Sequence, residues 1–101
     1  MKIEILTFDG CPNARSTREL VERVVAEAGF SVEVLDVAVP DPEAAERMRF
    51  LGSPTVRVDG RDIEPGADER TEYVLACRIY RTEHGVAGVP DEAWLRSAVD
   101  A

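Results

Sequence analysis

A strand–helix–strand pattern in the first forty residues is the strongest constraint on how this chain can fold. Residues 2–8 read KIEILTF, which is typical of a strand buried on both faces. Residues 13–28 carry apolar side chains at helical spacing, and Gly29 follows where a left-handed helix end is expected. Residues 31–39, SVEVLDVAV, form a second β-branched strand that ends at Pro40. This order predicts a right-handed βαβ unit with parallel strands.

A second helix and a hairpin are predicted next. Asp41 is a suitable N-cap and Pro42 a suitable first helical residue, and we expect this short helix to end at Gly52. Residues 53–64 read SPTVRVDGRDIE. The Asp-Gly pair at 59–60 predicts a type I′ turn between two antiparallel strands.

The remaining third of the chain is harder to assign. Residues 65–90 contain an apolar stretch that fits helix and strand templates about equally well. We expect a loop that leads into a short extended segment at residues 77–80, with Gly85 and Gly88 in turns. Residues 91–101, DEAWLRSAVDA, predict a closing helix with apolar side chains on one face.

Length and charge limit the class of protein. With 101 residues and 45% hydrophobic content, residues 1–101 are expected to form one domain with a modest core. The net charge of −8 disfavours nucleic-acid and anionic-membrane partners. The start, MKIEILTF, lacks the features of a signal peptide, so a cytoplasmic location is expected. Arg78 and Arg81, which flank Tyr80, are expected on the solvated surface.

The position of Cys11 suggests a reactive thiol. Cys11 follows the first strand, and Pro12 after it fits the first helical position. In open α/β sheets, functional groups gather at this end of a strand. The positive end of the following helix stabilises a thiolate there, and Arg15 and Arg18 in its first two turns would add positive potential. The alternative is that Cys11 is a small buried hydrophobic residue.

Two stretches resemble those of the thioredoxin superfamily: CPNA at residues 11–14, after the first strand, and GSPTVRVDG at residues 52–60, before the hairpin. The resemblance implies an α/β, thioredoxin-like fold with a central mixed four-stranded sheet flanked by about three helices. More narrowly, three motifs resemble a small bacterial group of thioredoxin-family proteins with cysteine or selenocysteine in an Asp-Gly-Cys-Pro motif: FDGCP at residues 8–12, RFLGSPT at residues 49–55 and CRIY at residues 77–80. A selenocysteine counterpart implies redox or soft-metal chemistry at Cys11, because selenium adds little to packing.

The resemblance also implies roles for individual residues. Cys11 would be the nucleophile, and Pro54 would be a cis-proline that faces it. The main chain of Ser53 would pair with an extended substrate. Pro12 and Thr55 complete the implied substrate-binding residues.

A resolving cysteine is missing from its usual place, because Ala14 stands where a Cys-x-x-Cys motif has its second cysteine. A dithiol cycle within that motif is therefore impossible. One remaining route uses an external low-molecular-weight thiol such as glutathione as co-substrate, and no other cofactor is expected. The other route uses Cys77, which is equally well explained as core filler.

Three functions stay open. In the first, the Cys11 thiolate attacks a disulfide-containing protein, a small disulfide or a peroxide, and Cys77 or an external thiol completes the redox cycle. In the second, Cys11 and Cys77 bind a soft metal such as Hg²⁺ or Cu⁺. In the third, the fold is a binding module without chemistry. His84 is expected to be a loop residue, and no other metal ligands are predicted.

Overall fold

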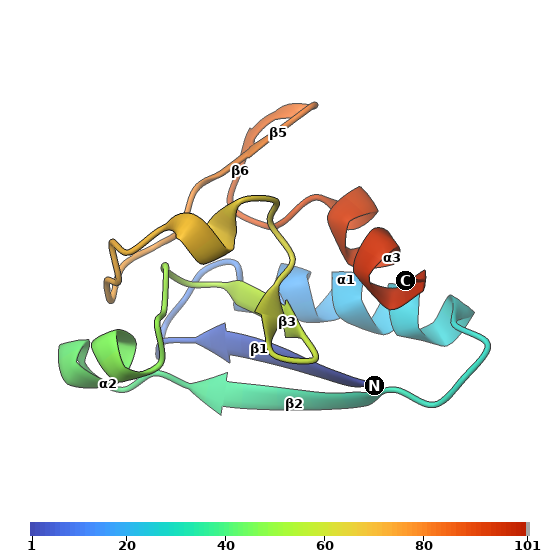
Figure 1. The fold of residues 1–101 in the computed structure, drawn as a ribbon, viewed down its shortest axis with the longest axis horizontal. Coiled ribbons are helices and arrows are strands. Elements are labelled where there is room, and N and C mark those ends of the chain that lie inside the picture. Colours follow the sequence, from blue (N-terminus) through green and yellow to red (C-terminus); the bar gives the residue numbers. More distant parts are fainter. Residues whose placement is uncertain (101) are drawn as a thin grey trace.

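A four-stranded mixed sheet forms the centre of the molecule, as expected (Figure 1). The computed structural model describes residues 1–100. The strands lie in the order β2-β1-β3-β4, with β1 parallel to β2 and antiparallel to β3. The strand bounds are β1 Lys2–Thr7, β2 Glu33–Ala38, β3 Thr55–Val58 and β4 Arg61–Asp62.

Three α-helices flank this sheet, and a short 3₁₀ helix follows β4. Figure 1 shows α1 and α3 together at one end of the sheet and α2 at the opposite end. Within residues 1–100, no helix is both long and apolar enough to cross a membrane. The helix bounds are α1 Ala14–Glu27, α2 Pro42–Arg47, η1 Ala67–Glu69 and α3 Glu92–Asp100.

Two apolar clusters form the core. The larger one joins β1 and β3 to one face each of α1 and α3, which is why the apolar residues of both helices recur at helical spacing. The smaller one joins the other side of β1 to α2, so β1 is buried on both faces. The buried members are Ile3, Ile5, Leu20, Val21, Val24, Val56, Val58, Ile63, Leu95 and Val99 in the first, and Leu6, Val39, Ala44, Ala45 and Phe50 in the second.

The ends of the first two helices differ from the predictions. After α1, Ala28 takes extended backbone angles (φ −72°, ψ 142°), so the left-handed turn predicted at Gly29 does not form. Helix α2 ends at Arg47, before the predicted Gly52, because Arg49 takes a left-handed φ of 55°. The guanidinium of Arg57 holds that turn by donating to the carbonyl oxygen of Arg49 at 3.1 Å.

The segment between η1 and α3 contains a second small sheet that the sequence did not predict. Strands β5 (Tyr80–Thr82) and β6 (Gly85–Ala87) form an antiparallel hairpin. Figure 1 shows this hairpin standing away from the four-stranded sheet. Just before it, residues 76–78 run extended beside the loop that precedes β3, which agrees in part with the extended segment expected at residues 77–80.

Candidate functional site

Cys11 lies in a tight turn between β1 and α1. Its N–H donates to the carbonyl oxygen of Phe8 and its own carbonyl accepts from the N–H of Ala14, both at 3.3 Å. Gly10 permits this reversal with a φ of 85°, which residues with a side chain rarely adopt. The thiol of Cys11 is free and the residue is half-buried. It is therefore accessible to a substrate.

Helix α1 begins at Ala14, later than predicted. Asn13 is its N-cap residue, so Pro12 precedes the cap and does not occupy the first helical position. The Asn13 side chain makes no capping hydrogen bond. It packs instead against Gly88, where an added Cβ would overlap the Asn13 side-chain amide. Gly88 thus allows the chain after β6 to lie against the start of α1.

Only one of the two arginines near the start of α1 is placed to favour an anion such as a thiolate. The first turn of α1 contains no acidic residue. Arg15 is exposed and has no carboxylate partner among residues 1–100. Arg18 pairs with Asp36 at 2.6 Å and with Glu22 at 3.6 Å. Of the two arginines expected to support a thiolate, only Arg15 is free of a carboxylate partner within the described chain.

The loop before β3 lies next to the turn that holds Cys11. The peptide bond between Ser53 and Pro54 is cis. The Ser53 hydroxyl accepts a hydrogen bond from the N–H of Phe8 at 3.3 Å, and Phe8 is the residue whose carbonyl binds the Cys11 N–H. Residues 52–55, which we call the cis-proline loop, and the Cys11 turn are therefore joined through Phe8.

Residues 76–78, which we call the 76–78 segment, pair with the other side of Ser53. The Ser53 N–H donates to the Ala76 carbonyl at 2.8 Å, and the Ser53 carbonyl accepts from the Arg78 N–H at 2.9 Å. Cys77 lies directly opposite Ser53 in a parallel bridge, and its thiol is free and exposed. Ser53 thus stands between the two cysteine-bearing segments. Exposure argues against the alternative that Cys77 is core filler.

The residues expected to bind substrate differ in accessibility. Pro12 is exposed, whereas Ser53, Pro54 and Thr55 are all buried. Both main-chain polar groups of Ser53 are bonded within the chain, so they are not free to pair with a substrate as the resemblance implied.

Arg78 is buried, and the prediction that it lies on the solvated surface is wrong. Its guanidinium donates to both carboxylate oxygens of Asp62, at 2.7 and 3.1 Å, and to Glu64 at 2.6 Å. It also donates to the Thr55 hydroxyl at 2.9 Å. Burial alone would lower the pKa of Arg78. The net pKa is nevertheless raised, and the hydrogen bond to Asp62 is the largest of the effects that raise it. Arg81, by contrast, is exposed as expected.

Tyr80 completes this buried network. Its hydroxyl donates to the carbonyl oxygen of Pro54, and the Arg78 guanidinium carbon lies 4.5 Å from the centre of its ring. Burial raises the pKa of Tyr80, so the phenol stays neutral. Sequence reasoning missed the joint role of Arg78, Asp62 and Glu64. The alternation of Asp62 and Glu64 around the buried Ile63 was the available signal, because it puts two carboxylates on one face of the chain.

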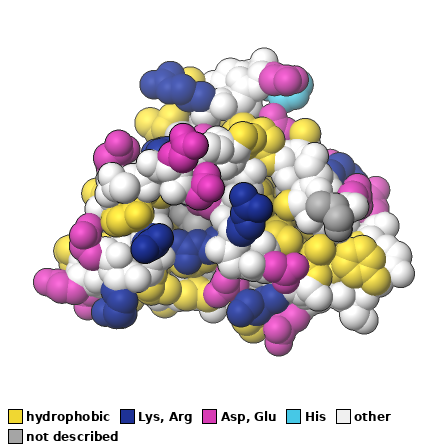
Figure 2. All heavy atoms as spheres, in the orientation of Figure 1, with side chains coloured by type: hydrophobic (Ala, Val, Ile, Leu, Met, Phe, Trp, Pro, Cys, Tyr) yellow, Lys and Arg dark blue, Asp and Glu magenta, His cyan; other side chains and the backbone are white. Residues whose placement is uncertain are grey.

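Two cavities of the molecule have neither cysteine in their lining. A cavity of about 750 Å³ runs along the β3–β4 hairpin and includes Arg49, Arg57 and Arg61 in its lining. Figure 2 shows a hollow in the middle of one face, with Lys or Arg side chains at its floor and rim. A smaller cavity of about 370 Å³ is lined by residues of β1 and α1 and by Asp36 of β2, and it reaches Ala14 at the start of α1. Neither lining includes a cysteine among the described residues.

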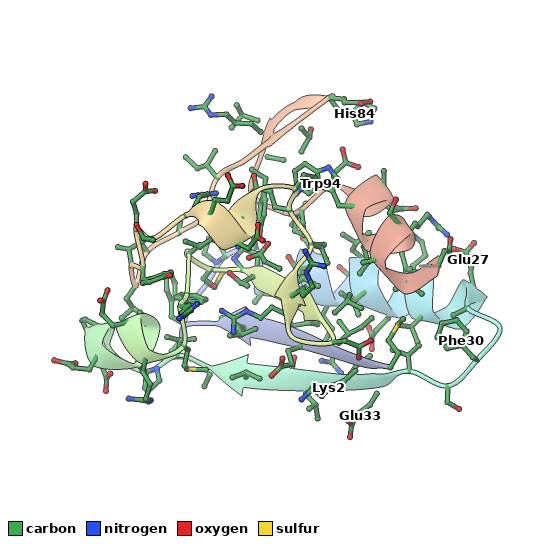
Figure 3. All side chains as sticks on the ribbon, in the orientation of Figure 1. Lys2, Glu27, Phe30, Glu33, His84 and Trp94 are labelled. Atoms are coloured by element: carbon green, nitrogen blue, oxygen red, sulfur yellow. The ribbon has the colours of Figure 1, made fainter. Side chains whose placement is uncertain are left out.

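The described residues do not bring a set of metal ligands together. Across residues 1–100, no three His, Cys, Asp or Glu side chains are grouped so that they could hold a metal ion. Figure 3 shows His84 at the outer tip of the β5–β6 hairpin, pointing into solvent, in keeping with its expected place in a loop.

Comparison with known proteins gives one match. A family model described as Thioredoxin domain matches residues 1–71. No curated protein and no solved structure matches the chain. The matched residues include Cys11 and the cis-proline loop and end before the 76–78 segment.

Proposed function

Because the chain belongs to the thioredoxin domain family, we propose that it is a thiol–disulfide oxidoreductase with Cys11 as its nucleophile. The position of Cys11 carries this proposal. Its free thiol lies in an accessible turn before a helix whose first turn has no acidic residue, and one residue, Ser53, links that turn to the segment that carries Cys77. Thiolates at such helix starts are favoured by the helix dipole.

The proposed reaction moves two electrons from the protein to a substrate disulfide. The Cys11 thiolate attacks one substrate sulfur, a bond forms between them, and the other substrate sulfur leaves as a thiolate that takes up a proton. The Cys77 thiolate then attacks the Cys11 sulfur. This second step forms a Cys11–Cys77 disulfide and releases the remaining substrate thiol. A low-molecular-weight thiol such as glutathione reduces the protein again and is itself oxidised to a disulfide.

Two features bear on the identity of the resolving thiol, and the second favours Cys77 over an external thiol. Ala14 replaces the usual second cysteine, so the resolving thiol must come from elsewhere. Cys77 is exposed and pairs across Ser53, whose hydroxyl contacts the Cys11 turn through Phe8. In the alternative route, a second external thiol attacks the mixed disulfide at Cys11, and Cys77 takes no part.

The motif at residues 9–12 supports a narrower assignment. Asp-Gly-Cys-Pro resembles the motif of a small bacterial group in which some members carry selenocysteine at the position of Cys11. Membership of that group would favour redox chemistry at Cys11. We further propose that residues 1–101 act as a single domain in a reducing compartment, the cytoplasm, where both thiols stay available.

The test is a reaction of the reduced protein with an aromatic disulfide whose leaving thiol absorbs light. The native chain should react at pH 7 at least ~10-fold faster than a free reference thiol, because a stabilised thiolate is the attacking species. It should release two leaving thiols and form a Cys11–Cys77 disulfide that mass spectrometry detects. Cys77→Ser should release one and keep a mixed disulfide at Cys11.

Cys11→Ser is the decisive variant. It should react only at Cys77, at the rate of the reference thiol. A Cys11→Ser chain that reacts as fast as the native chain would disprove the proposal. A native chain that stops at the mixed disulfide would instead assign resolution to an external thiol.

A further inference from the structure

We infer that Cys11 has no binding site for extended peptides and reacts with low-molecular-weight disulfides at least as readily, because the 76–78 segment occupies the main-chain pairing position beside it. This inference rests on the proposed redox function. The inference concerns which substrates the same site accepts. It assigns to residues 76–78 the role of keeping extended peptides from binding beside Cys11.

Main-chain hydrogen bonds are what an extended peptide needs in order to bind without a deep pocket. Such a peptide adds as a strand to free N–H and C=O groups at an exposed edge, and its side chains supply specificity. The cavities described above are not lined by Cys11, so a peptide at this site would depend on free main-chain groups nearby.

The cis-proline loop has its main-chain groups bonded within the chain. The Ser53 N–H and carbonyl pair with Ala76 and Arg78. The Pro54 carbonyl accepts from the Tyr80 hydroxyl, and the Gly52 carbonyl accepts from the Thr55 hydroxyl at 2.6 Å. A peptide would have to displace the 76–78 segment before it could pair with Ser53.

Displacement is opposed by the anchoring of Arg78. Its side chain is 1% exposed and binds Asp62 and Glu64, so moving the segment would separate a buried cation from two carboxylates. The backbone also lies close against the cis-proline loop. An added Cβ at Gly52 would be 2.9 Å from the Cβ of Arg78. The 76–78 segment is therefore a fixed wall of the site.

A small disulfide needs none of these main-chain groups. The surface around Cys11 includes the exposed residues Asp9, Gly10 and Pro12, and Cys77 is also exposed. A disulfide of a few heavy atoms on each side of the sulfurs can approach the Cys11 thiol across this surface without strand pairing.

The test compares a small and a larger substrate that share the same leaving thiol. One is glutathione and the other an unstructured ten-residue peptide with a central cysteine, each joined by a disulfide to the same absorbing aromatic thiol. Rates of thiol release by the full chain are divided by those of free N-acetylcysteine. We expect the two normalised rates to agree within ~3-fold and no saturation with the peptide. A preference for the peptide above ~10-fold, or saturation, would overturn the inference.

The same experiment separates this inference from the proposed function. If Cys11 reacts no faster than N-acetylcysteine with either substrate, the redox proposal itself fails and the inference falls with it. If Cys11 reacts fast but prefers the peptide, only the inference fails.

Amide hydrogen exchange provides a second measurement on the native chain. The amides of Ser53 and Arg78 should exchange as slowly as those in the centre of β1, and millimolar peptide should not change their rates. The inference would be overturned if both amides exchanged almost as fast as in an unstructured chain, or if adding peptide changed their exchange rates. Either result would mean that the 76–78 segment opens.

Discussion

The main-chain N–H of Arg78 donates to the carbonyl oxygen of Ser53 at 2.9 Å, immediately before the cis peptide bond. The same residue sends its side chain into the protein, where it binds Asp62 and Glu64. Arg78, which lies outside the family-matched residues 1–71, therefore connects the loop beside Cys11 to the β3–β4 hairpin. The stability of the site and its chemistry should depend on this connection.

Arg78→Met should lower the free energy of unfolding by about 3–5 kcal/mol, because it leaves the carboxylate of Asp62 without its cation and leaves Glu64 with Arg70 alone. Urea denaturation followed by circular dichroism measures the loss, and a variant that fails to fold counts as the same result. Arg81→Met is the matched control. Arg81 is exposed, so its loss should change stability by no more than about 0.5 kcal/mol. Equal effects at the two positions would contradict the buried network.

Gly52→Ala should destabilise the protein more than Gly60→Ala does. Both glycines have positive φ, 121° and 86°, so both variants carry backbone strain of about 1–2 kcal/mol. Only at Gly52 does an added Cβ meet other atoms, with the Cβ of Arg78 at 2.9 Å. That overlap should add about 1–3 kcal/mol to the loss of folding stability in Gly52→Ala. Thermal and urea unfolding of the two variants measure the difference in stability. Equal losses of stability would mean that the 76–78 segment does not lie close against the cis-proline loop.

Alkaline pH should unfold the protein through Tyr80. Burial raises the pKa of Tyr80 above its ordinary value of 10.0, so the folded state keeps the phenol proton to higher pH than the unfolded state does. Below about pH 10 the phenol is neutral in both states and its contribution to stability is constant. As pH rises further, only the unfolded chain ionises, and the free energy of unfolding falls.

Two tyrosine variants isolate this effect in urea titrations at pH 8 and 10.5. In Tyr80→Phe, the free energy of unfolding should fall less steeply above pH 10 than in the native chain. At pH 8 the substitution should also cost about 1–3 kcal/mol, because the buried Pro54 carbonyl loses its donor. Tyr73→Phe serves as the control and should keep the native pH dependence. An identical fall in all three chains would exclude Tyr80 as its cause.

Arg15 should support the reactivity of Cys11 more than Arg18 does. Arg15 lies in the first turn of α1 without a carboxylate partner among residues 1–100, whereas Arg18 is paired with Asp36. Arg15→Gln should slow alkylation of Cys11 at pH 7 about 2- to 5-fold, the size of effect expected for a charge near a helix terminus. Arg18→Gln should have a smaller effect. Iodoacetamide labelling with site-resolved mass spectrometry measures both, and the reverse order would contradict the charge assignment.

Local sequence signals predicted most of the fold. Asp41 caps α2 as expected, because its carboxylate reaches the N–H of Ala44 at 2.8 Å, only three residues away. Asp59 and Gly60 both have positive φ, as a type I′ turn requires, and they set the β3–β4 hairpin. These elements depend on neighbours in the chain, so a single sequence is enough to find them. The place of Cys11 between β1 and α1 followed from the same local reasoning.

The structure of the 76–78 segment could not be predicted in this way. Arg78 finds its partners at Thr55, Asp62 and Glu64, which are at least 14 residues distant in the chain, and no local pattern marks a buried arginine. The same reasoning explains the error at Gly52. Glycine suits a helix end, but Gly52 is required by the close approach of Arg78 and not by the end of α2.

The contact between Gly88 and Asn13 gives an indirect means of altering the surroundings of Cys11. A side chain at position 88 would press on Asn13, which is two residues after Cys11 and caps the helix that follows it. A library of substitutions at position 88 would therefore vary the packing at the start of α1 without altering Cys11 or either of its neighbours in the chain. Directed evolution of this protein toward new disulfides could start from a position far away in the sequence.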